Sequence, residues 1–262
     1  TTYYVRAEGT CNTTTCVNTT ITVNSFSTDP TSAGALPGTI CDGDATVLTV
    51  SGGSLGTGAN WFWYSGSCGV GFVGNGSPII LSPATTTTYF VRAEGSCNTT
   101  GCAIVTVTVN SNSTPAASAS ASSNPICAGN ATTLSVNGGS LGTGALWQWY
   151  SGGCGGVLQG NGTSLIVSPG ATTTYFVRAE GTCNVTSCVS ITITVNTLST
   201  DPASISATIN PLCSGNSTTL SVNGGSLGTG SAWQWYTGSC GGTFEATGSS
   251  IAVSPASTTT YF

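Results

Sequence analysis

Residues 173–184 read TTYFVRAEGTCN, and this stretch decides how the chain is organised. Nearly the same letters open the sequence and recur from Thr87, and the last four residues begin a further copy. The arginine of the motif recurs every 86 residues, as Arg6, Arg92 and Arg178. A repeat of that length corresponds to one small domain. The 262 residues are therefore predicted to form a tandem array in which each unit builds its own core.

One complete unit, residues 111–196, has the pattern of an all-β domain. Apolar and polar residues alternate in short runs, which is the period of half-buried strands, and Gly-rich or Pro-rich turns separate the runs. This pattern predicts seven short strands and no helix, at 115–123, 133–136, 146–150, 157–159, 164–168, 175–180 and 189–195. Short strands with frequent turn signals are typical of a β-sandwich of immunoglobulin type. The predicted fold is a series of such sandwiches, one per 86 residues.

The repeat also predicts the domain boundaries. Residues 1–24 correspond to the last two strands of a preceding repeat, and residues 197–262 correspond to a repeat without its last two strands. Between them lie two complete repeats, 25–110 and 111–196. The sequence begins and stops inside a domain, which has two explanations. Either it is a window on a longer tandem chain, which we expect because the cut falls within a strand, or the leading strands complete the tail domain of a neighbouring subunit.

Composition excludes several functions. Charged residues make up 4% of the chain, with no Lys and no His, so most general bases and metal-binding imidazoles are missing and no enzyme is expected. A net charge of -5 with only three Arg argues against nucleic acid and anionic membranes as partners. No cofactor or metal is expected. The chain has no apolar run long enough to span a membrane, so a signal or anchor would lie outside this window.

Twelve cysteines occur, four per period at equivalent positions. An even number at fixed spacing indicates disulfides and an oxidising compartment, so we expect an extracellular, secreted or cell-surface location. Zinc is the competing interpretation, because four residues separate Cys97 from Cys102, but no histidine is available. In an immunoglobulin-type sandwich, the turns before the second strand and after the third lie at one end, and the last hairpin lies at the other. This topology predicts the pairs Cys11–Cys16, Cys41–Cys68, Cys97–Cys102, Cys127–Cys154, Cys183–Cys188 and Cys213–Cys240.

The sequence resembles the immunoglobulin-like repeats of very large secreted surface proteins of Bacteroidota, among them adhesins of the gliding-motility and type IX secretion type. The resemblance covers the whole chain and rests on five matching segments: PICAGN at 125–130, GGSLGTG at 138–144, WQWY at 147–150, SP at 168–169 and the motif at 175–184. It implies an extracellular stalk or adhesive fibre, with no catalytic residues to transfer.

Some side chains are candidates for surface contacts. Each tryptophan pair, such as Trp147 and Trp149, could stack on sugars, but this strand supplies the buried tryptophan of a sandwich, so we expect them in the core. The tyrosines on the opposite face, Tyr64, Tyr150 and Tyr236, are better candidates for carbohydrate contact. Arg92 and Arg178 could belong to a repeated polar ligand site. The simpler interpretation is a local charge pair with the nearby glutamate, with the guanidinium stacked on the tyrosine.

These observations favour a mechanical function. Short linkers that end in proline limit bending, and a surface with few charges permits lateral association, so a semi-rigid, disulfide-stapled filament or adhesin stalk is predicted. Its expected partner is itself, through head-to-tail and lateral contacts. One alternative is a multivalent module that binds surface glycans or proteins through repeated weak sites. The other is a non-covalent polymer assembled by donor-strand exchange between subunits.

Overall fold

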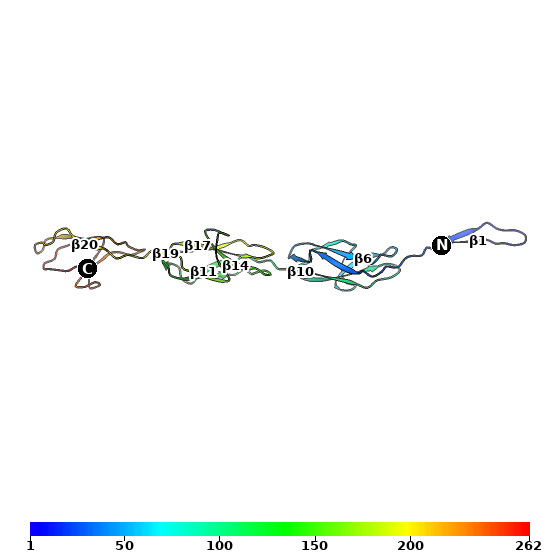
Figure 1. The fold of residues 1–262 in the computed structure, drawn as a ribbon, viewed down its shortest axis with the longest axis horizontal. Helices are drawn as coiled ribbons and strands as arrows, with labels where there is room; N and C mark the ends of the chain where they lie inside the picture. Colours follow the sequence, from blue (N-terminus) through cyan, green and yellow to red (C-terminus); the bar gives the residue numbers. More distant parts are fainter. The chain divides into compact units, whose positions relative to one another are not determined.

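The computed structural model describes all residues, 1–262, and consists of strands and loops without a helix (Figure 1). The chain divides into two compact units. The first contains residues 1–113 with 142–144 and 181–184, and the second contains the remaining residues to Phe262. The structure has no helix that is long and apolar enough to cross a membrane. The predicted all-β class of tandem immunoglobulin-like sandwiches is confirmed.

The first unit opens with a two-stranded hairpin and continues into a complete sandwich. The hairpin pairs β1 (Thr2–Val5) with β2 (Val17–Thr20). One sheet of the sandwich has the order β3-β5-β8 and the other β4-β10-β9-β6-β7. Their strands are β3 (Ser32–Leu36), β4 (Thr39–Cys41), β5 (Thr46–Ser51), β6 (Asn60–Ser67), β7 (Val70–Asn75), β8 (Ile79–Leu81), β9 (Thr87–Glu94) and β10 (Ala103–Asn110).

The second unit contains the next sandwich in the same arrangement. Its sheets have the orders β11-β13-β16 and β15-β14-β17-β18, and β12 pairs in parallel with β19. The strands are β11 (Ser118–Ala121), β12 (Ile126–Cys127), β13 (Thr132–Asn137), β14 (Leu146–Ser151), β15 (Val157–Asn161), β16 (Ser164–Val167), β17 (Thr173–Glu180), β18 (Val189–Ile193) and β19 (Val195–Asn196).

The seven strands predicted for residues 111–196 are present. The structure adds one short strand, β12, and divides the last predicted strand into two, β18 and β19. Sequence alternation did not reveal β12, because two residues are too few to show a period. The chain leaves β11 on one sheet and joins the other sheet as β12, next to the end of the last strand. That last strand divides at Thr194 into β18 and β19.

The second unit ends with a shorter repeat. It consists of β20 (Ser204–Ala207), β21 (Thr218–Asn223), β22 (Gln234–Thr237), β23 (Thr243–Thr247) and β24 (Ser250–Val253). One sheet, β20-β21-β24, has all three strands of its counterpart, but the other is reduced to β22-β23. Its fully packed core is accordingly small and contains Leu220, Trp235 and Ile251.

Each core is centred on one tryptophan of the WxWY strand. Trp63 and Trp149 are completely buried, and Trp235 is 2% exposed. The indole Nε1 of Trp149 donates a hydrogen bond to the carbonyl of Gly162 at 3.0 Å, so the polar atom of this buried ring is satisfied. Trp147 is 4% exposed and packs in the same cluster. The expectation that the tryptophans form the core is therefore confirmed.

The GGSLGTG loop holds the segment that precedes each sandwich. Thr143 Oγ1 accepts a hydrogen bond from the amide of Ser111 at 3.0 Å, and Ser113 Oγ accepts one from the amide of Gly142 at 2.9 Å. A Cβ at position 142 would lie 2.2 Å from the carbonyl oxygen of Ser111. Only glycine allows this close approach, which explains the glycine within the motif.

Candidate functional site

The cysteines are the first candidate site, and the structure pairs them differently from the sequence prediction. Within each complete repeat one bridge forms, Cys68–Cys102 and Cys154–Cys188, with a sequence separation of 34 in both cases. The predicted pairs Cys41–Cys68, Cys97–Cys102, Cys127–Cys154 and Cys183–Cys188 are therefore wrong.

The reason lies in the glycine-rich turn after β14. This turn folds back over the sheet, so that Cys154 Sγ lies 3.7 Å from Nη1 of Arg178. Arg178 belongs to β17, whose neighbour β18 begins directly after Cys188. The turn thus carries Cys154 to Cys188, with a Cα–Cα distance of 6.0 Å. Cys127, in contrast, pairs with Asn196 near the end of the last strand, away from Cys154.

A third bridge, Cys41–Cys183, spans 142 residues with a Cα–Cα distance of 5.5 Å. Both cysteines belong to the first compact unit, which includes residues 181–184. Each lies in a different copy of the repeat, so this bridge links consecutive copies covalently.

The remaining cysteines are free. Cys11, Cys16, Cys127, Cys213 and Cys240 are exposed, and Cys97 is half-buried. The predicted pairs Cys11–Cys16 and Cys213–Cys240 are thus not formed.

Next to Cys183, Asn184 makes two hydrogen bonds to the backbone of Ser113, a contact that the sequence did not predict. Asn184 Oδ1 accepts a hydrogen bond from the amide of Ser113 at 2.8 Å, and its Nδ2 donates to the carbonyl of the same serine at 2.9 Å. Asn98 holds Ser27 in the same way. The only signal in the sequence is that the motif ends in Cys-Asn, and nothing in that pair of letters indicates a contact 71 residues away.

The second candidate site is a tyrosine, arginine and glutamate cluster on the outer face of the sheet. Arg178 Nε donates to Glu180 Oε1 at 2.7 Å, and its Cζ lies 5.3 Å from the centroid of the Tyr150 ring. The hydroxyl of Tyr150 donates to the same glutamate oxygen. Arg92, Glu94 and Tyr64 repeat this arrangement. The expected stacking of arginine on tyrosine is therefore present.

Burial and mutual charge shift the pKa values in this cluster. The hydrogen bond from Tyr150, together with the positive charge of Arg178, lowers the pKa of Glu180 below its usual range. Burial and the hydrogen bond to Glu180 raise the pKa of Tyr150. The tyrosine therefore stays neutral and the glutamate stays ionised in its salt bridge with the arginine. Neither group is available as a general base.

The tyrosines proposed for carbohydrate contact are not on the surface. Tyr64 is 6% exposed and Tyr150 is 8% exposed, with the arginine guanidinium stacked over each ring and the hydroxyl bonded to glutamate. Arg92 and Arg178 are three-quarters covered and already bonded to glutamate. Tyr236 is half-buried, and its hydroxyl donates a hydrogen bond to Gln234. No cluster of three or more His, Cys, Asp or Glu side chains offers a metal site.

The fold and the bridges define a class: a disulfide-containing tandem of immunoglobulin-like sandwiches. The sequence matches the family described as "Ig-like domain CHU_C associated" at residues 28–110, 115–196 and 201–262, and the chain belongs to this family. This finding confirms the resemblance to Bacteroidota immunoglobulin-like repeats.

Several solved structures are similar to the chain at low identity. The three N-terminal domains of the highly immunogenic outer capsid protein of bacteriophage RB49 share 10% identity, with 90% of this chain and 89% of that chain covered and a TM-score of 0.35. The ectodomain of mouse nectin-like molecule 4 shares 15% identity over 85% and 89%, with a TM-score of 0.42. Murine CEACAM1b shares 15% over 64% and 99%, with a TM-score of 0.37. No curated protein matches the chain.

Proposed function

We propose that this chain is a structural part of an extracellular bacterial filament or adhesin stalk, with no catalytic role. The observation that carries the proposal is the Cys41–Cys183 bridge, because it joins one copy of the repeat to the next. A bridge between copies resists their separation under tension, which is what a load-bearing fibre requires.

The disulfides also support an extracellular location for the chain. Disulfides persist in oxidising environments, and three of them form in this chain. Together with membership of the family, they support an extracellular or cell-surface position. The low charge of the surface supports lateral contacts between filaments in addition to head-to-tail contacts.

The alternative of a multivalent glycan-binding module loses its main candidates, because Tyr64 and Tyr150 are covered.

Immunogold electron microscopy of the producing cells tests the proposal. An antibody against residues 111–196 is expected to label extracellular appendages at regular intervals, and the label should persist after a wash with free sugars. Label confined to the cell interior, or released from the surface by sugars, would contradict a structural role.

A further inference from the structure

The Cys41–Cys183 bridge changes the covalent path along the chain. Its sequence separation of 142 is much larger than the separation of 34 in each of the other two bridges. The shortest series of covalent bonds across this region runs through the two sulfur atoms and leaves out residues 42–182. These residues include every strand from β5 to β17. They form a closed loop that does not have to extend when the chain is pulled.

The two bridges within repeats do not lie on this path. Cys68–Cys102 joins two points inside the loop, and Cys154–Cys188 joins the loop to the segment that follows Cys183. Neither bridge makes the path through Cys41 and Cys183 any shorter. They therefore stabilise their own sandwiches and carry no tension while the bridge between copies is intact.

Hydrogen bonds hold the two ends of the loop close to the linker between the copies. The amide of Asp42 donates to the carbonyl of Asn110 at 2.9 Å, so the start of the loop lies beside the end of β10. Asn184, which follows Cys183, binds the backbone of Ser113. Both sides of the bridge thus lie at the linker, and tension crosses at this point without passing along the linker itself.

Each complete sandwich has only a small part of its core on the loaded path. The path contains β3 and β4 of the first sandwich and β18 and β19 of the second. Ile40 and Ile193 are the members of the two buried clusters that lie on it. The central Trp63 and Trp149 belong to the loop. Tension therefore acts on strands that hold one buried core residue each side of the bridge, and the rest of both cores is bypassed.

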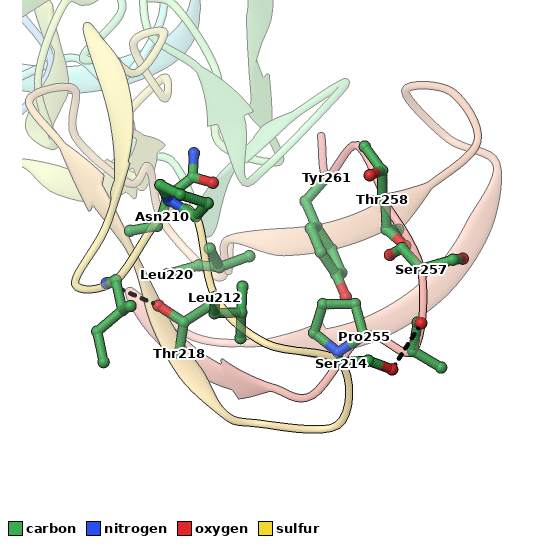
Figure 2. A pocket seen from close by; sticks show the side chains of 14 residues that line it. Asn210, Leu212, Ser214, Thr218, Leu220, Pro255, Ser257, Thr258 and Tyr261 are labelled. Atoms are coloured by element: carbon green, nitrogen blue, oxygen red, sulfur yellow. Dashed lines mark hydrogen bonds between the residues drawn. The ribbon is translucent and has the colours of Figure 1, made fainter.

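A cavity beside the bridge gives a reductant access to it. Both bridge cysteines are half-buried, and Cys41 lines a cavity of about 340 Å³ together with Asp44 and Thr182. A cavity of this size has room for a small thiol. The cavity of about 360 Å³ between Leu220 and Tyr261 (Figure 2) has no cysteine in its lining and gives no such access.

We propose that Cys41–Cys183 carries tension past residues 42–182 and that its reduction by a small thiol releases this segment as stored length. The inference rests on the proposed structural role and adds the path of the load and its regulation. Reduction of this bridge alone lengthens the fully extended chain by about 250 Å, at 3.3 to 3.6 Å per residue, because the other two bridges still hold back part of the loop.

The release step is a thiol–disulfide exchange. The thiolate of the small thiol attacks one sulfur of the bridge and forms a new S–S bond as the bond between Cys41 and Cys183 breaks. The other cysteine leaves as a thiolate and takes up a proton. One cysteine is then held in a mixed disulfide with the small thiol, and the covalent path runs through the whole loop.

Pulling the oxidised chain in optical tweezers, with handles at Thr1 and Phe262, tests the path. We expect the wild-type protein to extend to about 400 Å and the variant with Cys41→Ser and Cys183→Ser to about 650 Å. The variant with Cys154→Ser and Cys188→Ser is the matched control and should stop at the wild-type length, because its missing bridge is not on the path. Full extension does not require that a variant folds stably. Equal lengths of the wild-type protein and the first variant, or a longer control, overturn the inference.

Addition of 2-mercaptoethanol to the extended wild-type protein tests the release. The first elongation should be at least about 250 Å, and each bridge still intact at that moment should then add a step of about 110 Å. A step of about 110 Å that precedes the large one contradicts the proposed path. If these lengths fail while the antibody still labels appendages, the structural role stands and this inference alone fails.

Discussion

At the scale of single residues, Glu180 of the motif forms an ion pair with Arg178 and a hydrogen bond with the buried Tyr150. The sequence could predict that Arg178 pairs with Glu180 and stacks on Tyr150, because all three lie on one face of adjacent strands. It could not predict that the tyrosine is covered. The turn at residues 152–156 folds back over Arg178 and is bonded to Cys188, and neither its path nor this disulfide partner is evident from the sequence.

The lowered pKa of this glutamate predicts an acid-dependent loss of stability. A carboxylate with a depressed pKa in the folded state contributes stability above its unfolded pKa, and this contribution is lost as the pH falls through the folded value. We expect Glu94→Gln together with Glu180→Gln to lower the free energy of unfolding by about 1 kcal/mol per site at neutral pH. The acid-dependent decrease should also become smaller.

Urea unfolding monitored by tryptophan fluorescence between pH 3 and 8 would measure this effect. Glu245→Gln serves as the control, because its carboxylate is exposed and accepts its hydrogen bond from Thr237 rather than from an arginine or a tyrosine. An unchanged acid-dependent decrease in the double variant would show that these glutamates do not control it.

At the scale of elements, strands were predictable and bridges were not. Alternation of apolar and polar residues located the strands of the complete repeat, because each strand has one face in the core. The cysteines gave no such signal. Equivalent cysteines of successive repeats lie at the same repeat positions, so a pair within a repeat cannot be distinguished from a pair between repeats until the path of the turn is known.

Removal of a bridge within one repeat should destabilise that repeat. We expect Cys154→Ser with Cys188→Ser to cost about 3 to 4 kcal/mol, the value for closure of a loop with a sequence separation of 34. Calorimetry should show a lower transition temperature for the double variant. Cys213→Ser, at a free and exposed position, should leave the transition in place. Equal transition temperatures for all three proteins would indicate that the bridge is absent.

The glycine of the GGSLGTG loop gives a second prediction at this scale. Gly142→Ala places a Cβ 2.2 Å from the carbonyl oxygen of Ser111, so the backbone must move and the protein should lose more than about 1 kcal/mol of stability. Gly170→Ala is the control, since no atom lies within 4 Å of its added Cβ. Comparable stability of both variants in denaturant titrations would disprove the close approach.

At the scale of the whole molecule, the repeat period was visible from the first motif, and the family match agrees with tandem immunoglobulin-like domains. The covalent connection between copies was not predictable. It depends on Cys41 and Cys183, which are 142 residues apart and belong to different repeats. This connection is the main support for the proposed structural role, because it joins one repeat to the next covalently.

Trypsin digestion without reductant tests this connection most directly. The chain contains only Arg6, Arg92 and Arg178 as cleavage sites, so complete digestion of the alkylated, urea-denatured monomer gives three large fragments, 7–92, 93–178 and 179–262. In the variant with Cys154→Ser and Cys188→Ser, Cys41–Cys183 alone attaches the last fragment. We predict that all three fragments remain together until reductant is added. Release of fragment 179–262 without reductant would contradict the account.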